Sequence, residues 1–496
     1  MTATNGAAAR LAAARGTLAN TDVMRRPEGA LLARAFAAID AGDSAGAEAA
    51  LIDAGDAAPA TVLLMRGLLE QAENRAAAAR ATLGRVPVGN DVPYDVLCLC
   101  GDALLELGEP DAAIAAYDMA ITGAPHAALA FLRRGQARAL AGDVTGAIED
   151  LLRATLLQPT LDDAHCALGD EYRAASMTDA AYASYRRALA IDPDHAAAHA
   201  GLDTVLAQVI PHWHAAMLND AGRTEAFEGA IRRAVRPGMR VLDIGTGTGL
   251  LAMMAARAGA GHVTACESVG PLAEAAREII ALNGLTDRIT VIHAASADLV
   301  IDQDMSARAE LLIGEIVDAG LLCERIIETF ADARSRLLTP DAAIIPRGAT
   351  VYAVPVESVQ IAAEHRVDNV AGFDLSPFNG VVSGNYSQTD LARYDWRPLS
   401  APVEIFSFDF TDARPGAAET SRRLTPNADG AADAIAFWFR LALDDRSVID
   451  TGPGAAPTHW KQAVHTLATP VALKRNEPAR LIASHDGRMI RLELAR

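Results

Sequence analysis

The pattern of hydrophobic and polar positions changes character along the chain. From Leu31 to about Ala200 the chain is alanine-rich and its pattern is helical throughout. After Val235, short apolar runs bounded by turn residues alternate with helical stretches, as in an α/β fold. Beyond Pro346, segments such as VEIFSFDF and the final RMIRLELAR alternate between apolar and polar residues, which predicts strands. We therefore expect a multidomain chain with an all-α part, an α/β part and a β part.

The helical part contains a repeat of 34 residues. The positions that recur at this spacing are small residues, where two helices approach closely, and prolines, where one helix pair ends: Gly101, Gly135 and Gly169; Ala113, Ala147 and Ala181; Pro125, Pro159 and Pro193. This pattern resembles tetratricopeptide repeats, with two degenerate repeats expected earlier, from Leu31 to about Pro93. Such a stack leaves a concave groove, which we expect to dock a peptide or protein. A structural extension and a self-association surface are the alternatives.

Composition and charge narrow the possible partners. The chain has 496 residues, of which 51% are hydrophobic and 22% charged, so it can bury several cores. Its net charge of −19 argues against direct binding to nucleic acid and is compatible with a basic partner. Five cysteines without a CxxC pair favour the reducing cytoplasm. We find no signal peptide and no membrane span, and we expect a flexible tail over residues 1–28.

A glycine loop opens the α/β part. In RVLDIGTGTGLLAMMAARAGAGHVTACES, a short strand over residues 241–244 contains Asp243, and Gly245, Gly247 and Gly249 follow before a helix. Glycines let the backbone turn tightly and approach a ligand. Glu267 closes the next strand, where a carboxylate can accept hydrogen bonds from both hydroxyls of a ribose. The spacing resembles class I S-adenosylmethionine-dependent methyltransferases more than dinucleotide dehydrogenases, which implies S-adenosylmethionine as the cofactor.

Two glutamates, Glu315 and Glu324, lie nine positions apart in IGEIVDAGLLCERI. No lysine or arginine lies between them, so a salt-bridged surface helix is a poor explanation. This loop resembles that of the protein arginine methyltransferases. Three further segments agree in order: MLNDAGRT (217–224) resembles the family's cofactor-covering helix, GFDLSPFN (372–379) the start of its dimerisation arm, and PTHWKQ (457–462) its Thr-His-Trp loop.

The resemblance implies a role for each matched residue. It implies catalytic roles for Glu315, Glu324, His459, Asp220, Trp460 and Met217. His459 and Asp220 would join the β-barrel to the covering helix and relay a proton, and Trp460 would wall the arginine pocket. It implies that the cofactor is held by Arg223, Asp243, Gly245, Gly247, Gly249, Glu267, Ser296 and Ala297, and it implies no metal.

The chemistry of a guanidinium explains two carboxylates in one loop. The group is always charged, planar and rich in N–H donors. Two carboxylates can grip it in bidentate fashion and draw its positive charge away from the nitrogen that attacks. They also offset the repulsion between the substrate and the sulfonium of the methyl donor.

The chain departs from the family pattern at several positions. The covering helix lacks the family's tyrosines, so we expect either that His212 or Trp213 supplies the lid or that the lid orders only with substrate. Arg325 directly follows Glu324, with which it can pair. Asp318 resembles a branch of the family that includes monomethylating enzymes, and a solvent-facing loop acid is the alternative.

The predicted domains are a flexible tail (1–28), a tetratricopeptide repeat domain (29–203), a Rossmann-like S-adenosylmethionine-binding domain (204–345) and a β-barrel (346–496) with a dimerisation arm at about 373–400. The resemblance implies a homodimer that methylates arginine in proteins, with the repeats docking a basic substrate. Two alternatives stay open: methyl transfer to another acceptor, and a repeat scaffold without catalysis.

Overall fold

The computed structural model describes residues 2–19, 22–54, 59–89, 91–210, 213–382, 386–412, 414 and 416–495. The chain divides into two compact units, residues 1–208 and residues 209–496. The predicted boundary after residue 203 falls inside the last helix of the first unit, because an alanine-rich helix gives no turn signal at that point. Within the described ranges, the helices are all too short or too polar to cross a membrane.

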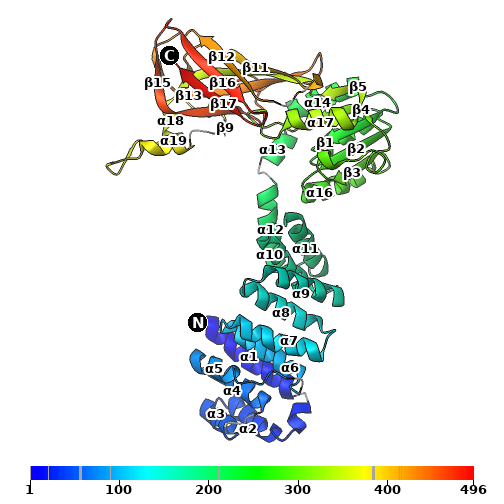
Figure 1. Cartoon of the computed structure of the whole chain (residues 1–496), viewed down its shortest axis with the longest axis vertical. Coiled ribbons are helices and arrows are strands. Elements are labelled where there is room, and N and C mark those ends of the chain that lie inside the picture. The colour runs from blue at the N-terminus through cyan, green and yellow to red at the C-terminus, as the bar shows by residue number, and fades with distance from the viewer. Residues whose placement is uncertain are drawn as a thin grey trace. The chain divides into compact units, whose positions relative to one another are not determined.

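The first unit is a stack of helix pairs (Figure 1). Consecutive helices from α2 to α11 pair with one another, and α12 follows the last pair. The helices are α1 (Thr2–Ala19), α2 (Gly29–Asp40), α3 (Ser44–Ile52), α4 (Ala60–Ala72), α5 (Ala76–Leu83), α6 (Tyr94–Glu106), α7 (Pro110–Gly123), α8 (Ala128–Leu140), α9 (Val144–Leu157), α10 (Asp162–Ala174), α11 (Thr178–Ile191) and α12 (Ala196–Val209).

The repeated glycine lies where the two helices of a pair touch. A Cβ atom at Gly101 in α6 would lie 2.6 Å from the ring of Tyr117 in α7. The same contact occurs 34 residues earlier, where a Cβ at Gly67 in α4 would lie 2.5 Å from Leu83 in α5. This shared geometry identifies α4 and α5 as one of the degenerate repeats.

The prediction of a flexible tail over residues 1–28 is wrong for the residues described. Residues 2–19 form helix α1, which packs against α4, and a short 3-10 helix follows at Asp22–Arg25. Leu11, Ala14 and Leu18 are buried in the same core as α4. Their spacing places them on one helical face, but two leucines among many alanines give a weak pattern in the sequence.

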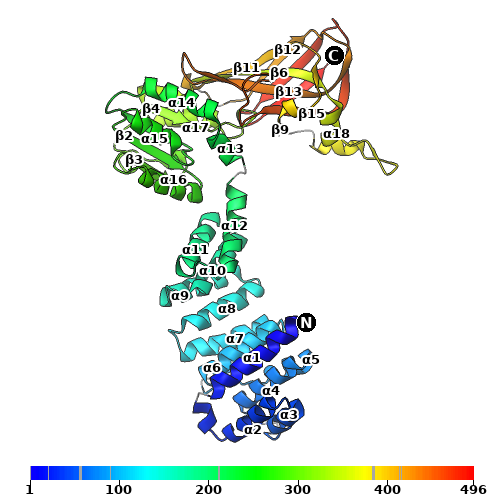
Figure 2. The ribbon, with the colours of Figure 1, turned by 180° about the vertical axis from the view of Figure 1, so that it is seen from behind.

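The second unit begins with a five-stranded parallel sheet of order β3-β2-β1-β4-β5. Helices pack against this sheet (Figures 1 and 2). Strand β1 has β2 on one side and β4 on the other, so the strand order reverses there. Ligands of open α/β sheets bind at the carboxyl ends of the strands at such a point. The elements are α13 (His214–Leu218), α14 (Ala221–Ala234), β1 (Arg240–Ile244), α15 (Leu250–Arg257), β2 (His262–Glu267), α16 (Gly270–Leu282), β3 (Ile289–His293), β4 (Ala309–Gly314), α17 (Ile326–Arg336) and β5 (Leu338–Ile345).

The rest of the second unit consists mainly of antiparallel strands and follows a cis peptide bond between Ile345 and Pro346. Seven strands form one sheet: β6 (Gly348–Glu357), β9 (Ser387–Thr389), β10 (Arg397–Pro398), β11 (Val403–Asp409), β13 (Gly430–Ala442), β14 (Val448–Asp450) and β15 (Gln462–Leu473). Three strands form another: β12 (Ala418–Leu424), β16 (Ala479–His485) and β17 (Ile490–Ala495). No strand pairing joins the two sheets among the described residues, so the closed β-barrel that the resemblance implies is not confirmed.

The predicted dimerisation arm divides into two parts. Its first part follows α18 (Val359–His365) and carries β7 (Asn369–Val370), β8 (Phe373–Asp374) and α19 (Asn379–Val382). Residues 383–385 lie outside the described residues. Its second part belongs to the sheet, because β9 pairs with β15 and β10 pairs with β6. The predicted range of 373–400 thus includes two strands of the sheet.

Candidate active site

The glycine loop turns sharply at the carboxyl end of β1. Gly245, Gly247 and Gly249 have φ values of +69°, +54° and +80°, a region that favours glycine. A Cβ at Gly245 would also lie 2.6 Å from the side chain of Ile316, the residue after Glu315. The loop therefore needs glycine both for its conformation and for its close approach to the segment after β4.

The two predicted acids beside this loop have different surroundings. Glu267 lines the cavity above the loop and accepts hydrogen bonds from the backbone N–H groups of Gly247 (3.0 Å) and Val269 (2.9 Å). Asp243 is fully buried below the loop and accepts a hydrogen bond from the Thr246 hydroxyl at 2.6 Å. Burial raises the pKa of Asp243 to about 7. Asp243 thus supports the loop and does not line the cavity.

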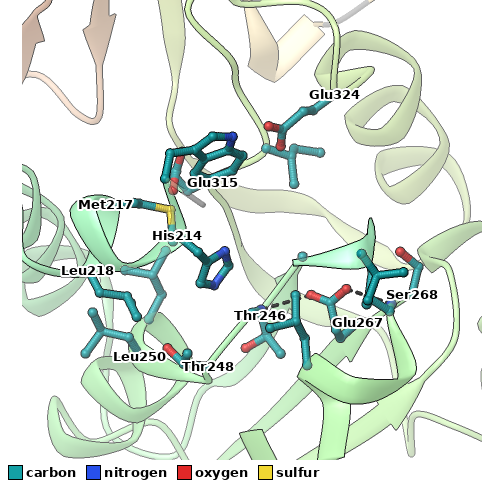
Figure 3. A pocket seen from close by; sticks show the side chains of 18 of the residues that line it. His214, Met217, Leu218, Thr246, Thr248, Leu250, Glu267, Ser268, Glu315 and Glu324 are labelled. Atoms are coloured by element: carbon teal, nitrogen blue, oxygen red, sulfur yellow. Dashed lines mark hydrogen bonds between the residues drawn. The ribbon is translucent and has the colours of Figure 1, made fainter. Parts of the chain in front are cut away.

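The cavity has a volume of about 340 Å³ and is lined by seven of the predicted site residues: Met217, Arg223, Gly245, Gly247, Glu267, Glu315 and Glu324. Figure 3 shows Glu315 and Glu324 on one side of it, Thr246 and Glu267 on the opposite side, and His214 between them. Met217 in α13 also lines the cavity, as predicted for the methyl-transfer pocket. Both carboxylates therefore face the space above the glycine loop.

Arg223 lies at the start of α14, where Asp220 caps the helix by accepting a hydrogen bond from its backbone N–H at 3.0 Å. The guanidinium is buried and donates from Nη2 to Glu315. Its Nε and Nη1 are buried without a hydrogen-bond partner among the described residues. Each of these N–H groups can still donate a hydrogen bond to an anion, which fits the predicted binding of the cofactor's carboxylate by Arg223.

The two glutamates of the loop have different electrostatic surroundings. Burial raises the pKa of Glu315, while the Arg223 guanidinium opposes that shift. Glu324 is exposed where the cavity opens, but its carboxyl group turns inward (Figure 3). Desolvation and the nearby charges of Glu315 and Asp318 raise the pKa of Glu324 to about 8. A bound cation would stabilise the ionised form of Glu324 and so lower this raised pKa.

The loop geometry shows which groups Arg325 and Asp318 contact. Arg325 adopts a left-handed conformation (φ 65°) and pairs with Glu328, with Nη2 and Oε2 2.6 Å apart, so it does not neutralise Glu324. Asp318 is not a free loop acid. It accepts hydrogen bonds from the backbone N–H groups of Gly320 and Cys323 and from the hydroxyl of Tyr386.

The predicted His459–Asp220 pair is present. The backbone N–H of His459 donates to Oδ2 of Asp220 at 3.0 Å, and His459 Nδ1 lies 3.2 Å from the same oxygen. Burial lowers the pKa of His459 to about 4, so its ring is neutral at pH 7. The pair joins the start of α14 to the Thr-His-Trp loop.

Trp460 lies outside the cavity. Its side chain is buried, packs edge-on against Phe439 with ring centroids 5.6 Å apart, and donates from Nε1 to the carbonyl of Val317 at 2.8 Å. The prediction that Trp460 walls the arginine pocket therefore does not match its position, because the indole nitrogen bonds the backbone of the glutamate loop.

A second cavity of about 480 Å³ adjoins the first and contains Ser296 and Ala297 after β3. The two cavities share Gly245, Ser268, Ile316 and Glu324. This arrangement fits a long cofactor with its amino-acid end near Arg223 and its base near Ser296, as the resemblance implies.

The sequence analysis did not identify His214 as a site residue. Its ring lines the first cavity, and neither ring nitrogen has a hydrogen-bond partner among the described residues. The next residue upstream, Trp213, also lines the cavity, whereas His212 lies outside the described residues. His214 lies three residues before Met217 in α13, so the two share a helix face, and this spacing could have indicated that His214 lines the site. Thr246, Thr248 and Ser268 were missed because short polar residues in loops carry no specific pattern.

A parallel sheet with a glycine loop at its switch point, beside an acid at the end of the second strand, defines a Rossmann-like methyltransferase. Models of known families match three segments: arginine methyltransferase oligomerization subdomain (347–486), ribosomal protein L11 methyltransferase (225–351) and tetratricopeptide repeat (162–195). One match falls in each of the three predicted parts, and together with the structure they confirm a helical repeat region, a Rossmann-like domain and a C-terminal antiparallel β domain.

Several curated proteins are similar to part of this chain. Arginine N(omega)-methyltransferase of Streptomyces achromogenes subsp. streptozoticus is 37% identical over 268 residues, which are 54% of this chain and 74% of that protein. Protein arginine N-methyltransferase 7 of Drosophila melanogaster is 32% identical over 54% of this chain and 46% of its own length. Protein arginine N-methyltransferase 9 of Mus musculus is 31% identical over 64% of this chain and 42% of its own length. The chain thus spans less than half of the latter two.

One solved structure shares the fold. The Trypanosoma brucei PRMT1 enzyme-prozyme heterotetrameric complex with AdoHcy contains a chain that is 28% identical, with a TM-score of 0.50 over 57% of this chain and 91% of that chain. The chain described here belongs to the arginine methyltransferase family, as the resemblance of its motifs predicted.

Proposed function

We propose that this chain is an S-adenosylmethionine-dependent methyltransferase that acts on arginine side chains of proteins. One observation carries the proposal: Glu315 and Glu324 line the same cavity as the glycine loop and Arg223, whose Nε and Nη1 have no hydrogen-bond partner among the described residues. This places two anions beside a site suited to a carboxylate-bearing nucleotide-type cofactor.

Different residues of the two cavities bind different parts of the cofactor. Arg223 binds its carboxylate, Glu267 accepts from its ribose hydroxyls, and Ser296 and Ala297 border its adenine. When bound, the cofactor supplies a methyl group on a sulfonium, which a nucleophile displaces in line.

Glu315 and Glu324 grip the substrate guanidinium and turn one nitrogen toward the cofactor. The transferred methyl group forms a C–N bond as its C–S bond breaks, and the nitrogen then loses a proton. We assign that proton to Glu324 and not to His459, because Glu324 lines the cavity, whereas His459 does not and its Nδ1 lies 3.2 Å from Asp220. We therefore assign His459 and Asp220 to holding α14 against the Thr-His-Trp loop.

The acceptor is tested by residue-level mapping. The full chain is incubated with isotope-labelled cofactor, a panel of basic arginine-rich proteins and free arginine, and the products are mapped by mass spectrometry. We expect label on arginine of proteins with the wild type and none with Glu324→Gln, which keeps the size of the side chain. Label on lysine or another acceptor, with none on arginine, would reject the proposal.

Free arginine is a second candidate acceptor, because the relative of which this chain covers 74% is named an arginine N(omega)-methyltransferase without the word protein. Label on free arginine alone would favour it. A non-catalytic repeat scaffold is the third possibility. Calorimetry with the cofactor tests the scaffold alternative, since a scaffold without catalysis would not bind the cofactor.

The repeats and the arm have proposed roles as well. The groove of the repeat unit docks the protein substrate, and loss of activity on proteins but not on short peptides after groove mutation tests this role. The arm joins two copies, since Phe373, Phe378 and Val381 are exposed large hydrophobic residues in it. Sedimentation of Phe373→Ser tests the homodimer.

All five cysteines are free, which suits a reducing cytoplasm.

A further inference from the structure

The loop that carries Glu315 and Glu324 is folded around one carboxylate. Asp318 accepts hydrogen bonds from the backbone N–H groups of Gly320 and Cys323, each at 3.1 Å. These two bonds close the loop on itself between the two glutamates. The position of the glutamates therefore depends on where Asp318 is held.

Tyr386 holds Asp318 from outside the loop. Its hydroxyl donates to Oδ2 of Asp318 and lies 3.0 Å from the Cys323 sulfur. Its ring packs edge-on against Phe437 of β13, with ring centroids 5.1 Å apart. A Cβ at Gly320 would lie 2.2 Å from the Tyr386 ring, so only glycine permits this approach.

The strand that follows Tyr386 contacts the Thr-His-Trp loop (457–462). Gln388 in β9 donates from Nε2 to the carbonyls of His459 (3.0 Å) and Trp460 (3.1 Å). Trp460 in turn donates to the carbonyl of Val317 in the glutamate loop. Residues 386–388 thus touch both loops, and the loops touch each other.

We propose that Tyr386 is a positioning residue whose hydroxyl, through Asp318, fixes the loop of the two glutamates against the C-terminal sheet. A hydrogen bond to a carboxylate is stronger than a neutral one, and the ring is anchored on Phe437 and cannot follow the loop. A displacement of about 1 Å at the reacting group can slow a reaction about 100-fold. The proposal rests on the methyl transfer proposed above.

The variant Tyr386→Phe removes only the hydroxyl and keeps the ring contacts. We expect kcat to fall about 10- to 100-fold, while the cofactor Kd and the melting temperature stay close to those of the wild type. The matched control is Tyr394→Phe, which removes a hydroxyl that donates to Glu364 at 2.7 Å. Both residues lie outside the cavity, the glutamate loop and the Thr-His-Trp loop. We expect no change in kcat for this control.

Amide hydrogen exchange tests the same contact without turnover. We expect the amides of Gly320 and Cys323 to exchange faster in Tyr386→Phe than in the wild type, with no change in Tyr394→Phe. Unchanged kcat and unchanged exchange in an active enzyme would overturn the inference. If the wild type transfers no methyl group, the proposed function fails, and the exchange rates still decide whether Tyr386 fixes the loop.

Discussion

The Arg223–Glu315 ion pair allows a sharp test of the site's electrostatics. Both side chains are nearly fully buried, with relative exposures of 3% and 5%. The variant Arg223→Met keeps much of the packing volume and leaves the carboxylate of Glu315 buried without its partner. Breaking a buried ion pair by removing one partner lowers the free energy of unfolding by about 3–5 kcal/mol.

The size of this effect depends on pH in a defined direction. Burial raises the pKa of Glu315 above its ordinary value, and the guanidinium that opposes the shift is absent in the variant. The folded variant then binds a proton that the unfolded chain releases, so its stability falls as the pH rises. We expect the destabilisation to grow between pH 5 and pH 8, by at most about 1.4 kcal/mol per pH unit.

Tryptophan fluorescence during urea unfolding measures the effect in the full chain. The four tryptophans, Trp213, Trp396, Trp438 and Trp460, all lie in the second unit, so the repeats do not contribute to the signal. The double variant Arg223→Met/Glu315→Gln should recover part of the loss, because no buried charge remains.

The control is Arg233→Met in the same helix. It breaks a pair with Asp444 whose side chains are 34% and 25% exposed, and such a pair contributes less than about 1 kcal/mol. A loss in Arg223→Met no larger than in Arg233→Met, or one that is constant from pH 5 to pH 8, would refute the reasoning.

Three further predictions follow from other contacts. Gly247→Val should weaken cofactor binding at least 100-fold by calorimetry, because the glycine has φ +54° and its Cβ would enter the cavity 3.4 Å from a histidine ring; normal binding would contradict the loop's role. The kcat/KM for an arginine peptide should decrease as the pH falls below about 8, because Glu324 must be ionised to bind the guanidinium; a flat profile from pH 6 to pH 9 would argue against the clamp. Gly101→Ala should destabilise the repeats by about 1–3 kcal/mol through its clash with Tyr117, whereas Gly123→Ala, which meets no atom within 4 Å, should not; circular dichroism during urea unfolding compares the two.

The local patterns of the sequence were sufficient for much of the fold. The 34-residue spacing of Gly101, Gly135 and Gly169 predicts the helix pairs, because each repeat places the same small residue at the same helix contact. The glycine loop and the glutamates after β4 could be located as well, since both follow strands whose apolar runs are plain in the sequence. The family resemblance supplied the chemistry that these positions share.

Only the tertiary structure showed which side chains contact one another in the site, because the contacting residues lie far apart in the chain. Arg223 and Glu315 are 92 residues apart, and Tyr386 and Asp318 are 68 residues apart. No periodicity encodes such pairs, so the sequence did not show that Arg223 contacts a catalytic glutamate or that Tyr386 holds the loop. The same holds for Trp460, whose burial against the sheet depends on Phe439 and Val317. The sequence by itself thus located the glycine loop and the two glutamates, while the orientation and charge of the site residues are set by contacts that form only when distant segments pack together.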